Sequence, residues 1–247
     1  MSFVLALGFL VGSAAAAASA CSATAPLSCQ STGTIQNTCC TEVQGQVLQV
    51  QFWDSSPATG PANSWTIHGL WPDNCDGTYK STCDSSRAYT DISCTLQDRG
   101  ATDILNYMET YWKDYQGKDE SFCCYTNYRA EDELIDFLNT TITLFKDLPT
   151  YQWLANAGIT PSSSKTYTNT AITSALKAKF GATPILTCTS GELNQIQYAF
   201  NVRGSVAHGN FVPVNPTGTS GNCPKTGIKY LPKDLSTTPQ ADEGSCG

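Results

Sequence analysis

The sequence predicts an α+β fold in which helices flank an antiparallel β-sheet and disulfides tie the chain together. Three observations predict it: segments in which apolar residues alternate, segments in which they follow helical spacing, and 12 cysteines among 247 residues. The strand-like and helix-like segments come in mixed order, without an internal repeat or a long linker. We therefore expect one domain over residues 21–233, followed by a polar tail over residues 234–247 that is loose unless Cys246 tethers it.

Two alternating segments predict half-buried strands. Residues 46–53, QVLQVQFW, divide between two faces, one with Leu48, Val50 and Phe52, the other with Gln49, Gln51 and Trp53. Residues 195–203, QIQYAFNVR, turn four side chains inward: Ile196, Tyr198, Phe200 and Val202. Alternation with a period of two residues is typical of a strand with one buried face.

A third alternating segment, SWTIHGLW, contains one of only two histidines in the chain. Ile67 faces one way along this strand, so His68 faces the other. We expect the strand to end at Gly69 and Pro72, which leaves His68 projecting from its polar face.

Three segments have helical spacing. Two of them carry apolar and aromatic residues on one face: Ile104, Met108, Tyr111, Trp112 and Tyr115 in the first, and Leu134, Phe137, Leu138, Thr141 and Phe145 in the second. The third spans residues 171–180, with Asn169 or Thr170 as its N-cap and Gly181 as its stop signal.

Residues 1–20 have the pattern of a secretory signal peptide. An apolar run leads into small residues that end at Ala20, which predicts cleavage before Cys21. No later stretch is long enough to span a bilayer. We expect a secreted, extracellular monomer without a membrane partner, and Asn139 opens an Asn-Thr-Thr glycosylation motif.

Cysteine and histidine usage argues against metal and redox chemistry. All of the cysteines follow the predicted cleavage site, and an even number in an exported chain predicts disulfides. No Cys-x-x-Cys pair is present, and two histidines supply few zinc ligands. We therefore expect neither a metal ion nor another cofactor.

The net charge of −7 argues against a protein that coats nucleic acid, which would be basic. RNA remains possible as a substrate, because an enzyme needs to hold only one or two nucleotides.

Three side chains suited to binding a nucleobase follow His68 closely: Trp71, Asp73 and Tyr79. Two aromatic faces and a carboxylate can sandwich a base and hydrogen-bond its edge. A histidine on a strand is more often a structural group, but an imidazole beside such a pocket can also exchange protons near neutral pH. The combination favours nucleotide chemistry.

The string TIHGLWPD at residues 66–73 closely resembles the first conserved segment of the ribonuclease T2 family, which comprises secreted, metal-independent RNases. Other segments resemble fungal members of the family over residues 21–233: LQVQFWD, NCDGTY, YWKDYQGKDESF, CYTNY, LPTYQWLANAGITPS, FNVRGS and GIKYLPK.

The resemblance implies cleavage of single-stranded RNA through a 2′,3′-cyclic phosphate, with the substrate's own 2′-hydroxyl as the nucleophile. It implies that His68 is a catalytic acid or base. The residues that match the primary base pocket are Trp71, Asp73 and Tyr79, and Gln51 and Phe122 are weaker matches to a second base site. The implied disulfides are Cys21–Cys39, Cys29–Cys75, Cys40–Cys124, Cys83–Cys123 and Cys188–Cys223, which leaves Cys94 and Cys246 as a further potential pair.

One family segment is missing from this sequence. Family members carry Phe-Trp-x-His-Glu-Trp-x-Lys-His-Gly-Thr-Cys, which supplies a second catalytic histidine together with Glu and Lys. Here Phe122 is followed directly by Cys123, so about 17 residues are absent if Cys123 and Cys124 are the cysteines that flank the gap. We interpret His208 as an ordinary surface histidine, and nothing in the sequence places Glu120 or Lys118 near His68.

The missing segment makes the activity of this form doubtful. A general acid or base contributes about 10²–10⁴-fold to a rate, and charge stabilisation about 10²–10³-fold. Either the sequence is a mis-spliced gene model of an active enzyme, or the protein is an inactive relative that still binds a nucleotide or a partner. The clean excision and the intact base pocket favour a mis-spliced gene model.

Overall fold

The computed structural model describes residues 25–30, 40–79, 89, 91–113, 132–207, 209–218 and 220–238. In these residues a seven-stranded, mostly antiparallel sheet packs against helices, which confirms the predicted α+β fold. None of the helices in those ranges is long and apolar enough to cross a membrane.

Three long strands form the centre of the sheet: β1 (Gly45–Phe52), β2 (Thr66–Asn74) and β5 (Glu192–Arg203). β1 lies between the other two and pairs antiparallel with both. The shorter strands are β3 (Thr166–Tyr167), β4 (Ile185–Thr189), β6 (Asn210–Pro213) and β7 (Ile228–Lys229). β4 and β6 pair antiparallel with β5, whereas β7 pairs parallel with it.

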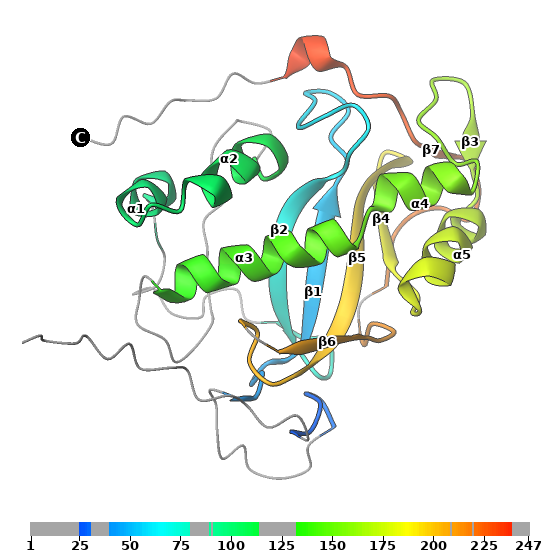
Figure 1. The fold of residues 1–247 in the computed structure, drawn as a ribbon. Coiled ribbons are helices and arrows are strands. Elements are labelled where there is room, and N and C mark those ends of the chain that lie inside the picture. The colour runs from blue at the N-terminus through cyan, green and yellow to red at the C-terminus, as the bar shows by residue number, and fades with distance from the viewer. Residues whose placement is uncertain are drawn as a thin grey trace, which may run out of the picture.

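The described helices are α1 (Ile92–Asp98), α2 (Thr102–Tyr111), α3 (Asp132–Asp147), α4 (Thr150–Asn156) and α5 (Asn169–Phe180). Figure 1 shows α3 crossing one face of the central strands, with α1 and α2 toward the β2 edge and α4 and α5 toward β4. A 3₁₀ turn, η3 (Leu235–Thr237), follows the last strand.

All three predicted helices are present, with different ends. α2 ends at Tyr111, so Trp112 lies just beyond it. α5 begins at Asn169 because the Thr168 hydroxyl, rather than Asn169 or Thr170, caps it by accepting a hydrogen bond from the Ala171 amide. α1 and α4 were not predicted, because seven residues are too few for a clear helical period.

β1 is buried on both faces, so the prediction of a half-buried strand was wrong for it. Two of its three glutamines, Gln49 and Gln51, are fully buried on the face that packs against the helices. The inward face of β5 is confirmed, because all four predicted side chains are buried there: Ile196, Tyr198, Phe200 and Val202. A central strand has neighbours on both sides and side chains on both faces, so its polar residues do not mark a solvent face.

Two disulfides hold the edges of this sheet. Cys29–Cys75 ties the N-terminal segment to the end of β2, with the Cα atoms 5.3 Å apart. Cys188–Cys223 ties β4 to the segment before β7, with a Cα separation of 4.8 Å. Cys40 and Cys94 are also disulfide-bonded. The other implied pairs each include a cysteine outside the described residues: Cys21–Cys39, Cys40–Cys124, Cys83–Cys123 and Cys94–Cys246.

The chain after β7 docks on the loop between β1 and β2. The buried ammonium of Lys233 donates to the backbone carbonyls of Thr59 and Ser64 and lies 4.6 Å from the ring centre of Trp53. The Asp234 amide donates to the Ser55 carbonyl at 2.8 Å. The first residues of the predicted tail are therefore held against the domain.

Candidate functional site

His68 lies at a β-bulge in β2. Val50 and Gln51 are adjacent in β1, and they pair with Gly69 and Ile67 of β2. His68, between those two partners, is therefore the extra residue of the bulge. A bulge bends the strand and re-aims a side chain. β2 continues through Gly69 and Pro72 and ends at Asn74, so the prediction that Gly69 and Pro72 end the strand was wrong.

Three contacts fix the position of His68. Its imidazole stacks on the Phe52 ring, with 4.0 Å between ring centres and 18° between planes. Its Nδ1 lies 3.2 Å from Oε1 of Gln195 in β5. The indole N–H of Trp112 donates to the His68 carbonyl at 3.3 Å, which anchors the bulge to the end of α2.

Burial lowers the pKa of His68 to about 4, and the Gln195 hydrogen bond opposes part of that shift. Removing the ring from water disfavours its charged form. His68 is therefore neutral above about pH 4 and has a free lone pair on one nitrogen over most of the acidic range.

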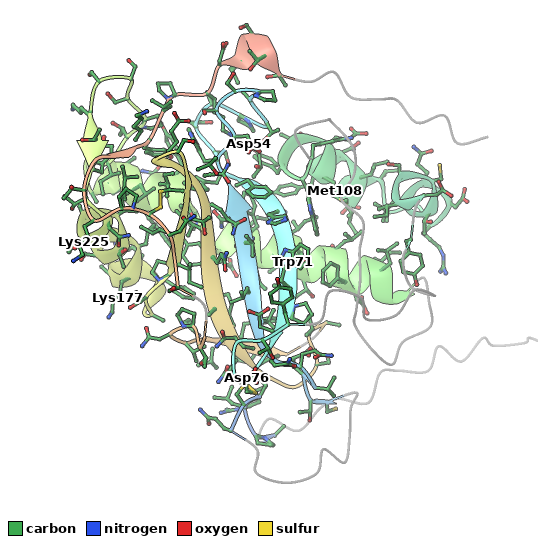
Figure 2. The ribbon with its side chains drawn as sticks, turned by 180° about the vertical axis from the view of Figure 1, so that it is seen from behind. Asp54, Trp71, Asp76, Met108, Lys177 and Lys225 are labelled. Atoms are coloured by element: carbon green, nitrogen blue, oxygen red, sulfur yellow. A yellow bond between two sulfur atoms is a disulfide. The ribbon has the colours of Figure 1, made fainter. Side chains whose placement is uncertain are left out.

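Trp71 follows His68 on the same strand, with 5.2 Å between the two ring centres. Its side chain is 47% exposed, which is unusual for tryptophan and leaves an indole surface open to solvent. Figure 2 shows Trp71 on β2, on the face of the sheet opposite α3. Through these contacts the exposed indole lies next to the histidine.

Asp73 and Tyr79 continue this region beyond Trp71. Asp73 is opposite Gln46 of β1 and is buried, and the loss of water raises its pKa to about 6. The Asn74 amide then donates to the Thr78 carbonyl and closes a turn at the end of β2. Tyr79, just after this turn, is 73% exposed.

A sequence profile of the ribonuclease T2 family matches residues 28–210 of this chain. The chain belongs to the ribonuclease T2 family. Ribonuclease Trv of Hypocrea rufa is 50% identical over 234 residues, covering 88% of this chain and all of the relative. Ribonuclease T2 of Aspergillus oryzae is 45% identical over 84% of this chain and 82% of its own length.

Solved structures of T2 ribonucleases have a similar fold. The structure of Actibind, a T2 ribonuclease, has 43% sequence identity and a TM-score of 0.79, over 87% of this chain and 98% of that one. RNase NT in complex with 5′-AMP shares the fold, with 18% identity and a TM-score of 0.53 over 76% of this chain and 98% of that chain.

Gln51 does not lie with the other candidate residues of this ribonuclease T2 chain. It pairs with Ile67 and Ile196, which places it on the helix-covered face of the sheet. Its amide donates to the Leu148 carbonyl at 3.1 Å, and its carbonyl accepts from the Thr150 hydroxyl at 2.6 Å. Gln51 is therefore buried on the face of the sheet opposite Trp71, and its match to a second base site stays a prediction.

The remaining predicted residues have different outcomes. Phe122 and His208 lie outside the described residues. Asn139 is exposed on α3 and lines a groove of about 660 Å³ on the helix side of the sheet. Among the residues that the structure describes, no group of three or more His, Cys, Asp or Glu side chains could hold a metal ion.

Sequence reasoning missed Phe52, Gln195 and Trp112, which hold His68. Phe52 was predicted on the apolar face of its strand, together with Leu48 and Val50. His68 lies on that same face of the sheet and stacks on the Phe52 ring. Gln195 alternates with Ile196, so its face was predictable from the sequence. Its contact with His68 was not, because that contact depends on β1 pairing with both β2 and β5.

Proposed function

We propose that this chain derives from a secreted endoribonuclease that cleaves single-stranded RNA by transphosphorylation through a 2′,3′-cyclic phosphate. The observation that supports it best is the neutral, firmly held imidazole of His68 beside the exposed indole of Trp71. Membership of the ribonuclease T2 family supports the same chemistry.

The reaction needs two proton transfers and no enzyme nucleophile. One group removes the proton of the 2′-hydroxyl, and another protonates the 5′-oxygen as it leaves. His68 supplies one of them, because its lowered pKa keeps the ring neutral above about pH 4, with a lone pair that can take up a proton. Trp71 and Tyr79 stack on the base, which is worth about 1–3 kcal/mol per base, and Asp73 hydrogen-bonds the base edge.

We propose that the second catalytic segment is missing between Phe122 and Cys123. The alignment with Ribonuclease Trv supports the missing length. The alignment spans 234 positions, whereas 88% of 247 residues is about 217, so about 17 of the aligned positions have no counterpart in this chain. Those residues would supply the second histidine, the glutamate and the lysine.

The chain in this form is therefore a severely impaired ribonuclease. Losing one proton-transfer group costs about 10²–10⁴-fold, and losing the cationic and carboxylate groups with it costs more. We favour a mis-spliced gene model over a natural loss, because the sequences on both sides of the junction are intact. Sequencing the transcript across the Phe122–Cys123 codons distinguishes the two: codons for the segment establish mis-splicing, and a direct junction establishes a natural loss.

The function is tested by inserting the corresponding residues of Ribonuclease Trv between Phe122 and Cys123. We expect this restored chain to leave 2′,3′-cyclic phosphate ends on single-stranded RNA without added metal. Replacing His68 by Gln in the restored chain should lower the rate about 10²–10⁴-fold. A restored, folded chain that makes no cyclic ends would refute the proposed function.

A second candidate is a non-catalytic module that still binds a nucleotide, and the exposed Trp71 and Tyr79 favour it. Stacking on these rings does not need the missing segment. Titrating nucleoside monophosphates into the chain as given should quench tryptophan fluorescence to saturation. Trp71→Ala should abolish the signal, whereas Trp153→Phe, on the helix side, should retain it. No saturable signal that depends on Trp71 would eliminate this candidate.

We also propose that residues 1–20 are removed before Cys21, that residues 21–233 form the secreted, monomeric enzyme domain, and that Asn139 is glycosylated. The disulfides support export, because such bonds persist in oxidising compartments. The exposure of Asn139 supports modification there, although its motif lies within α3, so the glycan must be added before this helix forms. N-terminal sequencing and the mass lost on deglycosylation of secreted protein test these points.

A further inference from the structure

One side chain from a distant part of the sequence touches the histidine. Gln195 of β5 pairs directly with Phe52 of β1, and Phe52 stacks on His68 of β2. The three side chains thus lie in a row across three adjacent strands. Nδ1 of His68 and Oε1 of Gln195 are 3.2 Å apart, although the two residues are 127 positions apart in sequence.

We propose that Gln195 is a positioning residue for catalysis, which rests on the proposed function of His68. Its amide oxygen accepts the Nδ1 proton of His68, so that the neutral ring has its lone pair on Nε2. Nε2 is then the nitrogen that exchanges a proton with the substrate. The partner of one ring nitrogen of a histidine selects which nitrogen is protonated.

The direction of this hydrogen bond matters for a group that gains and loses a proton. With the amide oxygen toward the ring, Nδ1–H donates both in the neutral imidazole and in the imidazolium. With the amide nitrogen toward the ring, the hydrogen bond would require an unprotonated Nδ1 and would be lost on protonation. The orientation found, with Oε1 facing Nδ1, leaves the bond intact through a full proton-transfer cycle.

Phe52 and Trp112 do not determine which ring nitrogen of His68 is protonated. The Phe52 ring fixes the plane of the imidazole by stacking on it, and Trp112 fixes the backbone through the His68 carbonyl. Neither of them contacts a ring nitrogen by hydrogen bonding. Among the described residues, the Gln195 side chain makes a single hydrogen bond, and that bond is to His68.

The test reads the ring of His68 directly by nitrogen-15 NMR. The chain has only two histidines, so His208→Asn leaves a single imidazole to observe. In that background we expect neutral His68 to carry its proton on Nδ1. Gln195→Ala should give a mixture of the two neutral forms. Gln195→Glu should retain the proton on Nδ1 and raise the pKa of His68 by about 1–3 units, because a carboxylate then faces the imidazolium.

Gln197→Glu is the matched control, because Gln197 lies two residues along β5 on the same face and pairs with Val50 rather than Phe52. It adds the same charge without the hydrogen bond, so we expect a smaller rise in the pKa of His68. In the restored chain, Gln195→Ala should lower kcat about 10–100-fold with little change in KM, and Gln195→Glu should move the acidic limb of the pH profile upward.

Unchanged protonation of Nδ1 in Gln195→Ala, or equal pKa shifts for the two glutamate variants, would overturn the role of Gln195. The NMR result does not depend on turnover. If the expected spectra are seen but the restored chain forms no cyclic ends, the proposed ribonuclease function fails and the hydrogen bond between Gln195 and His68 stands.

Discussion

The imidazole of His68 is stacked on Phe52 and largely removed from water, and this makes folding sensitive to pH. The unfolded chain binds a proton below about pH 6.5, whereas folded His68 does so only below about pH 4. Between these values the unfolded state holds more protons, so this group makes folding less favourable as the pH falls.

We predict that His68→Gln removes the part of the stability loss at acidic pH that protonation of this histidine causes. Relative to the parent chain, the variant should gain about 1–3 kcal/mol in unfolding free energy between pH 7 and pH 4.5. Urea unfolding at both pH values measures the difference. A constant difference between the two proteins would mean that the pKa of His68 is not lowered by folding.

Asp73 has the opposite perturbation, because burial raises its pKa to about 6. Below that pH the carboxyl group can donate a hydrogen bond, and above it the carboxylate only accepts. We predict that the relative affinity for different nucleoside monophosphates changes between pH 5 and pH 7. Asp73→Asn should remove that change and weaken binding about 10-fold. A base preference in the parent chain that does not vary with pH would contradict this role.

At the residue scale, candidate site residues that are close together in the sequence could be predicted. Trp71, Asp73 and Tyr79 lie on one strand and in the chain just after it, so they could be proposed together from one short segment. That they form one base pocket stays a prediction. Gln51 was predicted on the polar face of a half-buried strand, and this was wrong because a polar residue on a central strand can be buried against helices. The contact of Gln195 with His68 depends on strand order and register, which the local pattern does not encode.

At the scale of elements, the end of α2 supports the bulge that carries His68. The Trp112 indole donates to the His68 carbonyl, and the ring is buried in the core. The periodic segments 104–115, 134–145 and 171–180 were predictable as helices because each covers several turns. The bulge was not predictable, because an extra residue in one strand shows only when its partner is known.

The direct joining of Phe122 to Cys123 bears on the disulfides that the family resemblance implies. The resemblance pairs Cys83 with Cys123 and Cys40 with Cys124. Cys123 and Cys124 are adjacent in this chain. Adjacent Cα atoms are about 3.8 Å apart, and side chains of adjacent residues in extended chain point to opposite sides. Two separate bridges are difficult to form from one such point, and an unmade bridge costs about 2–5 kcal/mol.

We therefore predict free thiol at Cys83 or Cys123 in the chain as given, together with poor secretion. Thiol labelling followed by peptide mapping checks this, with the restored chain as the control. Complete bridges and equal melting temperatures in both proteins would show that the junction imposes no strain.

On the scale of the whole molecule, buried acids favour stability in acid. Glu42 is 6% exposed, and burial raises its pKa to about 7 despite a hydrogen bond from the Gln44 amide. The folded state thus holds a proton that the unfolded chain releases near pH 4.5. Its stabilising effect is complete below that pH and is lost as the pH rises through about 7.

We predict that Glu42→Gln flattens this dependence. Between pH 5 and pH 7.5 the parent chain should lose about 2–3 kcal/mol of unfolding free energy relative to the variant. Thermal unfolding at the two pH values provides the measurement. A variant that follows the parent chain at both values would indicate that Glu42 is ionised in the folded protein at pH 5.

The fold of the molecule allows a direct comparison between the chain as given and the restored chain, because the face that carries His68 forms without the segment that we propose is missing. The measurement is the rate at which single-stranded RNA gains 2′,3′-cyclic phosphate ends with the chain as given and with the restored chain. We predict that the restored chain is faster by at least about 10³-fold, since it regains both proton-transfer and charge-stabilising groups. Equal rates would contradict the account, because His68 would then act without a second catalytic segment.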